Sequence, residues 1–79
     1  MGVLEHLIFE LMEKNLDYEI NQLGKENGYQ EQIILKVKEK DLFVYIIKNE
    51  KTLSYYIAEK GQKRERISKQ TLLEKIKGL

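Results

Sequence analysis

Residues 32–58 read QIILKVKEKDLFVYIIKNEKTLSYYIA, and this stretch decides the fold. Its three apolar segments are Ile33 to Leu35, Leu42 to Ile47 and Leu53 to Ile57. β-Branched and aromatic residues dominate all three segments, and the polar breaks at 38–41 and 49–52 have the length of hairpin loops. The stretch therefore predicts the middle of an antiparallel sheet.

An amphipathic helix is predicted before this sheet, from about Val3 to Lys14. Apolar residues recur there at the i, i+3 and i+4 spacing of one helix face, and they are Val3, Leu4, Leu7, Ile8, Leu11 and Met12. His6 falls on the polar face, so we expect it to face solvent. Asn15 is expected to end the helix because asparagine tolerates the left-handed conformation found at many helix ends.

A first strand is predicted next, because Leu16, Tyr18 and Ile20 alternate with polar residues. Residues 23–28 contain Asn27-Gly28, a strong hairpin signal, and are expected to turn. After the central strands, Gly61 can turn the chain so that residues 63–67 add a short fifth strand.

A C-terminal helix is predicted after the fifth strand, capped by Ser68 or Thr71. Its apolar stripe is Leu72, Leu73, Ile76 and Leu79. The expected fold is one α+β domain over residues 1–79, with an N-terminal helix, an antiparallel meander sheet of three to five strands and a C-terminal helix.

The predicted sheet has two unlike faces. Alternation places one set of aliphatic residues together as the core face, and they are Ile33, Leu35, Val37, Leu42, Val44 and Ile46. The second face mixes aromatic, aliphatic and basic residues, with one of Tyr55 and Tyr56 joining it. Three explanations fit this second face: the C-terminal helix or a loop covers it, it pairs two copies of the chain, or it binds a ligand.

The size and composition of the chain limit the ways in which its fold can be stabilised. A domain of 79 residues often depends on a disulfide, a metal or a partner subunit, but the chain has no cysteine and one histidine. We therefore expect no structural metal and no cofactor, and a homodimer becomes an attractive means of support. The longest uncharged apolar run has six residues, Leu42 to Ile47, against the roughly 20 that span a bilayer. The sequence thus predicts a cytoplasmic protein that does not enter the membrane.

No catalytic signature is present. Ser54 and Ser68 have no histidine near them in sequence, and a magnesium nuclease motif of the form Glu-x-Lys fails because in Ile46-Ile47-Lys48 isoleucine replaces the required carboxylate. A non-enzymatic binding module is expected.

Charge is divided unequally along the chain, although the net charge is only +1. Residues 1–35 carry two lysines and seven carboxylates, whereas residues 36–79 carry twelve basic groups and six acidic ones. Both arginines lie in a basic loop before the last helix, where backbone N–H groups at the helix end can also hold phosphate. These features favour RNA or DNA as the partner. The candidate binding residues are Lys60, Lys63, Arg64, Arg66 and Lys69 in the loop region, with Lys36, Lys38, Phe43, Tyr45 and Tyr56 on the sheet.

The order of elements is similar to that of double-stranded RNA-binding domains, in which a basic segment also precedes the last helix. Those domains carry a Gly-Pro-x-His loop and an alanine-rich second helix. This chain instead has Gly24 to Tyr29 without proline or histidine, and Leu72-Leu73 in the last helix. We do not assign it to that family. The alternative function is a protein-interaction or inhibitor module of the kind that phages and mobile elements carry, in dimeric form.

Overall fold

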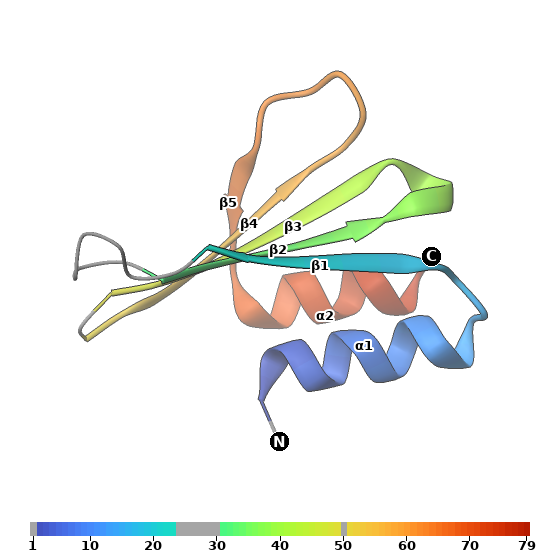
Figure 1. Ribbon diagram of the computed structural model, residues 1–79, viewed down its shortest axis with the longest axis horizontal. Helices are drawn as coiled ribbons and strands as arrows, with labels where there is room; N and C mark the ends of the chain where they lie inside the picture. The colour runs from blue at the N-terminus through green and yellow to red at the C-terminus, as the bar shows by residue number, and fades with distance from the viewer. Residues whose placement is uncertain (1, 24–30, 50) are drawn as a thin grey trace.

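Along the chain, five strands follow a first helix and precede a second one in the computed structural model, which describes residues 2–23, 31–49 and 51–79 (Figure 1). The elements are α1 Val3–Glu13, β1 Tyr18–Leu23, β2 Glu31–Val37, β3 Leu42–Lys48, β4 Leu53–Ala58, β5 Glu65–Ile67 and α2 Lys69–Lys77. The predicted α+β fold is confirmed, and the short fifth strand is present.

The strands form one antiparallel meander in the order β1-β2-β3-β4-β5. Leu35 lies opposite Val44, and Val44 lies opposite Ile57 on the next strand. Because side chains alternate along a strand, the rows two residues away share this face. Its most buried members are Leu35, Val37, Leu42, Val44, Ile46 and Ile57, in agreement with the predicted core face.

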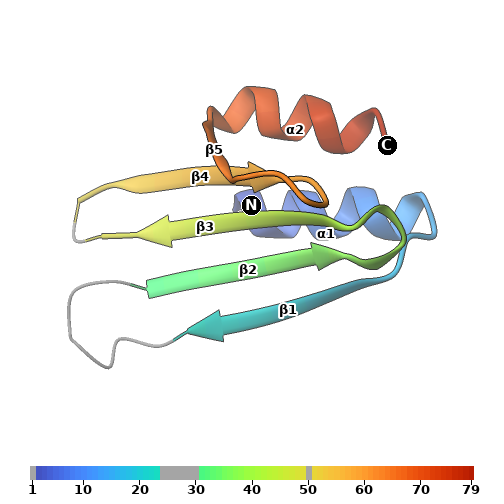
Figure 2. The same cartoon turned by 90° about the horizontal axis from the view of Figure 1, so that it is seen from above.

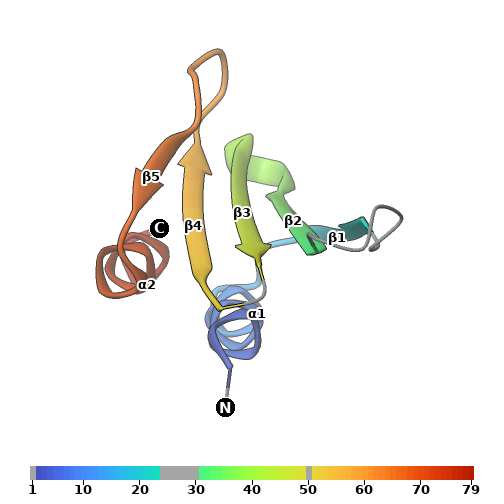
Figure 3. The same ribbon diagram turned by 90° about the vertical axis from the view of Figure 1, so that its left-hand side faces the viewer.

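Both helices pack on this same face. Leu7 and Leu11 of α1 are fully buried in one cluster with Leu35, and Leu72 and Ile76 of α2 complete that cluster. Figure 3 shows the two helices on one side of the sheet, and Figure 2 looks onto the other side, where neither α1 nor α2 lies in front of the strands. The possibility that α2 covers the second face is therefore wrong, and the molecule has two layers.

The connections follow local backbone chemistry. Asn15 adopts a left-handed conformation (φ 56°) after α1, as predicted, and Asp41 does the same (φ 49°) after the short 3-10 turn Lys38–Lys40. Gly61 has φ 75° in the turn between β4 and β5, also as predicted. Ser68 caps α2, because its Oγ accepts a hydrogen bond from the Thr71 backbone N–H at 3.2 Å. The turn predicted at 23–28 lies outside the described residues, except for Leu23, which ends β1.

Two predicted positions differ in the structure. Leu16 precedes β1 instead of lying in it, because its N–H donates to the Leu11 carbonyl oxygen at 2.9 Å and its side chain packs against the core. Met12 belongs to the predicted apolar stripe but is 62% exposed. It lies five residues after Leu7 and hence about 140° around the helix from it, beyond the part of the stripe that meets the sheet.

Candidate functional site

The face of the sheet opposite the helices, which we call the open face, consists of three cross-strand rows. The middle row is Asn21, Ile34, Tyr45, Tyr56 and Arg66. The rows beside it are Glu19, Lys36, Phe43 and Ala58 on one side, and Leu23, Gln32, Ile47 and Ser54 on the other. The register thus brings aromatic and basic side chains from four strands onto one surface.

Three aromatic side chains occupy the centre of the open face, and we call them the aromatic platform: Phe43, Tyr45 and Tyr56. Phe43 and Tyr45 are two residues apart on β3, and their rings stack with centroids 6.4 Å apart and planes 23° from parallel. Tyr56 lies directly opposite Tyr45 on β4. All three are half-buried, so each ring packs against the sheet and still reaches solvent.

Basic side chains lie over the platform. The Arg64 guanidinium carbon is 5.3 Å from the Tyr45 ring centroid and 4.9 Å from that of Tyr56. On the neighbouring row, Lys36 Nζ is 5.6 Å from the Phe43 ring centroid. Cation–π contacts of this kind contribute about 0.5–1 kcal/mol each at exposed sites. They hold positive charge beside aromatic rings.

Two aliphatic or small residues of the open face are buried. Ile47 is 6% exposed and Ala58 is 8% exposed, although both lie on the open face and outside the cluster beneath the helices. Ile47 lies between Gln32 and Ser54 in its row, and Ala58 lies opposite Phe43. The open face therefore contains buried positions beside the half-buried rings of the platform.

Six of the ten residues predicted from sequence meet on the open face, and they are Lys36, Phe43, Tyr45, Tyr56, Arg64 and Arg66. The other four do not: Lys38, predicted on the sheet, lies in the 3-10 turn after β2, and Lys60, Lys63 and Lys69 lie outside the strands. Lys38 Nζ is 3.2 Å from a Glu19 carboxylate oxygen, and Lys60 Nζ is 3.6 Å from one of Asp41. Lys63 is exposed in the loop before β5, and Lys69 is the exposed first residue of α2.

The position of Arg64 is the feature that sequence reasoning missed. The sequence grouped Arg64 with the loop that leads to α2, whereas the structure places its guanidinium on the sheet over two tyrosines. Arg64 is two residues before Arg66, which pairs with Tyr56, so alternation along the chain puts both arginines on one side. Gly61, which can turn the chain into a fifth strand, was the sequence signal from which this position of Arg64 could have been predicted.

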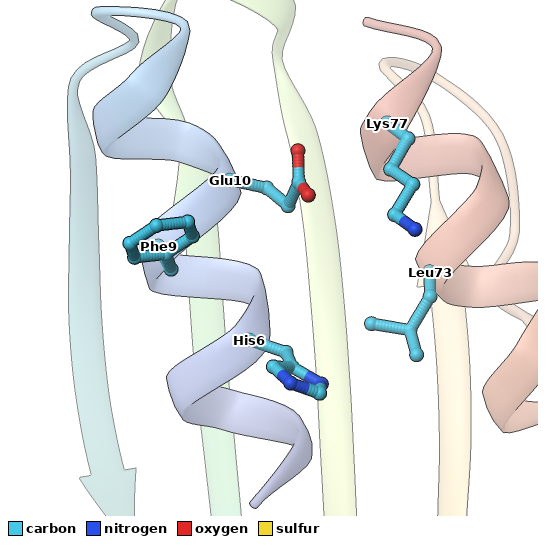
Figure 4. A pocket seen from close by; sticks show the side chains of 5 residues that line it. All are labelled: His6, Phe9, Glu10, Leu73 and Lys77. Atoms are coloured by element: carbon cyan, nitrogen blue, oxygen red, sulfur yellow. The ribbon is translucent and has the colours of Figure 1, made fainter. Parts of the chain in front are cut away.

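The helix side carries a separate shallow hollow between α1 and α2 (Figure 4). His6, Phe9, Glu10, Leu73 and Lys77 line it. His6 is exposed there, as predicted from the helix pattern. Among the described residues no three His, Cys, Asp or Glu side chains are grouped so that they could hold a metal ion.

Comparison with known protein families, curated proteins and solved structures finds no match to this chain. The helices of the described ranges are all too short or too polar to cross a membrane.

Proposed function

We propose that the open face binds single-stranded nucleic acid, RNA or DNA, without catalysis. Bases stack on the aromatic platform, and Lys36, Arg64 and Arg66 hold the backbone phosphates. The observation that carries this proposal is the Tyr45–Tyr56 pair with Arg64 above it, on a sheet face that neither α1 nor α2 covers.

Stacking requires flat apolar surfaces that solvent can reach. Sheet-based modules that bind single strands present aromatic rings to unpaired bases, and each stacked base contributes about 1–3 kcal/mol. The half-buried rings of the platform satisfy this requirement on two adjacent strands.

Phosphate contacts are available at the border of the platform. Arg64 and Arg66 are exposed, and neither forms a salt bridge within the described part of the chain. In the complex, a base takes the place of the Arg64 guanidinium on the tyrosine rings, and the long side chain turns to a neighbouring phosphate. Arginine suits this role because its planar group both stacks and binds phosphate through two parallel hydrogen bonds.

A single strand fits this surface better than a duplex. Bases of a duplex are stacked on one another, so their flat faces are unavailable to Tyr45 or Tyr56. A protein that held only duplex phosphates would not need aromatic rings at the centre of its basic surface.

Fluorescence anisotropy of labelled single-stranded and double-stranded RNA and DNA, over a salt series, tests the proposal. We expect the single strands to bind more tightly, with a logarithmic salt slope of about −2 from roughly three phosphate contacts. Arg64→Ala/Arg66→Ala is expected to remove most of the binding and to reduce the slope by about 1.4.

A matched control separates the local contacts from overall charge. Lys75→Ala/Lys77→Ala also removes two positive charges, but from exposed positions on the helix side of the molecule. This variant should retain nearly the full affinity. Equal losses in the two double variants, or no binding of any single strand at low salt, would refute the proposal.

A protein-interaction or inhibitor module is the second candidate, and the half-buried Ile34 beside Tyr45 favours it because its side chain offers apolar contact and no charge for a phosphate. A protein partner would cover the platform together with Ile34. In that case a protein captured by the wild-type chain would be lost on Tyr45→Ala, while nucleic acid would bind no better to the wild type than to the variant.

A further inference from the structure

The outer edge of β1 is an unprotected strand edge. β1 is the first strand in the sheet order, so within the described residues its outer backbone groups have no partner strand. Its six residues, YEINQL, include one charge, on Glu19, and Lys38 already pairs with that carboxylate at 3.2 Å. Ile20 is 40% exposed although it lies on the helix side of the sheet. Such an edge readily accepts another strand.

The opposite edge of the sheet is protected by comparison. β5 has only three residues, Glu65–Ile67, and its neighbours include Lys63, Arg64 and Lys69. Short edge strands and basic side chains are devices by which proteins prevent edge pairing. One edge of this sheet is therefore closed, and the other can extend the sheet.

We propose that two copies of this chain pair through antiparallel β1 strands, about a two-fold axis at Ile20. The sheets of the two copies then become continuous. This inference does not depend on nucleic-acid binding, because it rests on the β1 edge and on residues away from the platform.

Charge and apolar contact select this register. In an antiparallel pair, directly opposite residues lie on the same face of the sheet. A two-fold axis between two identical strands must therefore set one residue opposite the same residue of the partner. An axis at Glu19 would set two like charges opposite each other, which is destabilising. An axis at Asn21 would leave Ile20 against the partner's Gln22. An axis at Ile20 joins the two exposed isoleucines and sets Glu19 against the partner's Asn21.

Exposed apolar surface on the helix side lies beside this interface. Met12, which is 62% exposed, lines a hollow together with Leu16 and Tyr18 at the start of β1. In the proposed register the partner's Gln22 lies opposite Tyr18, so the end of the partner's β1 borders this hollow. The pairing thus brings the partner's strand next to the hollow that Met12 lines.

Sedimentation equilibrium of the full chain over a concentration series is the first test. We expect a dimer for the wild type and a dissociation constant roughly tenfold or more higher for Ile20→Lys, since the two lysines would repel each other at the axis. The matched control is Leu53→Lys, because Leu53 is also an exposed aliphatic strand residue (52%) but lies on β4. A wild type that stays monomeric, or a dimer that Ile20→Lys leaves intact, would overturn the proposal.

A cysteine substitution tests the register itself and does not introduce a charge. The chain has no cysteine, so Ile20→Cys supplies one thiol per copy. The Cα atoms of opposite residues in an antiparallel pair are about 4.5–5.5 Å apart, a distance that a disulfide can bridge. Mild oxidation should yield a covalent dimer of Ile20→Cys and much less of Leu53→Cys. Equal yields from the two variants would contradict the pairing at Ile20.

Discussion

Tyr45 is the residue on which the proposed site depends most. It stacks on Phe43 along β3, lies opposite Tyr56 on β4 and receives the Arg64 guanidinium on its ring. A phenyl ring alone can make the stacking contacts, whereas the hydroxyl group is needed only for hydrogen bonds. The contributions of the Tyr45 ring and of its hydroxyl group to binding can therefore be measured separately by substitution.

We expect Tyr45→Leu to weaken the binding of a single strand by about 1–3 kcal/mol, the range for one stacked base. Tyr45→Phe keeps the ring and should bind within about twofold of the wild type. Fluorescence anisotropy measures both affinities, and circular dichroism verifies that both variants are folded. If Tyr45→Leu binds as well as Tyr45→Phe, the ring does not stack on a base.

Alternation along β3 predicted that Phe43 and Tyr45 share a face, alternation along β2 added Lys36 to it, and the register confirms both. The same reasoning could not choose between Tyr55 and Tyr56, because consecutive residues always point to opposite faces. The choice depends on how β4 aligns with β3, where Tyr55 pairs with Ile46 and faces the core. That alignment is fixed by packing between strands, and the pattern of residues in one strand alone does not predict it.

At the scale of elements, the β4–β5 hairpin controls where Arg64 lies. Gly61 has φ 75° in its turn, a conformation that costs other residues energy. The Gln62 N–H donates to the Glu59 carbonyl oxygen at 2.9 Å across this turn. β5 pairs with β4 over only three residues, so the turn contributes much of what holds the hairpin together.

We expect Gly61→Ala to lower the free energy of unfolding by about 1–2 kcal/mol, because a Cβ disfavours the left-handed conformation. It should also weaken single-strand binding, since a distorted hairpin displaces Arg64 from the platform. Urea denaturation and anisotropy measure the two effects. Gly78→Ala is the control, because Gly78 has an ordinary φ of −83° and an added Cβ there meets nothing closer than 3.5 Å. Equal stability of the two variants would contradict the role of the turn.

Periodicity predicted both helices but not the face on which α2 packs. The stripe of α2 needs an apolar surface, and both faces of the sheet offer aliphatic and aromatic residues. The structure shows one reason for the outcome: β5 leads through the single residue Ser68 into α2, and Leu72 and Ile76 reach the cluster formed with α1. Contacts between two helices far apart in sequence cannot be read from either stripe alone.

In the whole molecule, the acidic N-terminal part and the basic C-terminal part of the sequence do not form one acidic face and one basic face. The carboxylates of α1 and the lysines of α2 lie on the same helix side, where Glu10 and Lys77 line one hollow (Figure 4). Long-range attraction of a polyanion is therefore expected to be weak, as the net charge of +1 also indicates. Affinity in the proposed complex depends more on stacking than on overall charge.

Pairing through β1 would place two aromatic platforms on one continuous surface. The two-fold axis runs through the sheet, so the open faces of both copies point the same way, and a long single strand can contact both platforms. Binding to the second platform is then intramolecular, which raises the affinity without any new contact. A strand too short to reach the second platform gains nothing.

We therefore expect the affinity for single strands to rise steeply once the oligonucleotide is long enough to span both platforms, by about 100-fold or more. Ile20→Lys should abolish this rise and leave the affinity for short oligonucleotides unchanged, because Ile20 lies on the opposite side of the sheet from Tyr45. Anisotropy with a series of oligonucleotide lengths provides the measurement, with Leu53→Lys as the control that keeps the rise. A wild type whose affinity increases only in proportion to length would show that the two platforms do not act together, whether or not the chain is a dimer. Loss of short-strand binding in Ile20→Lys would place part of the binding site on the β1 edge itself.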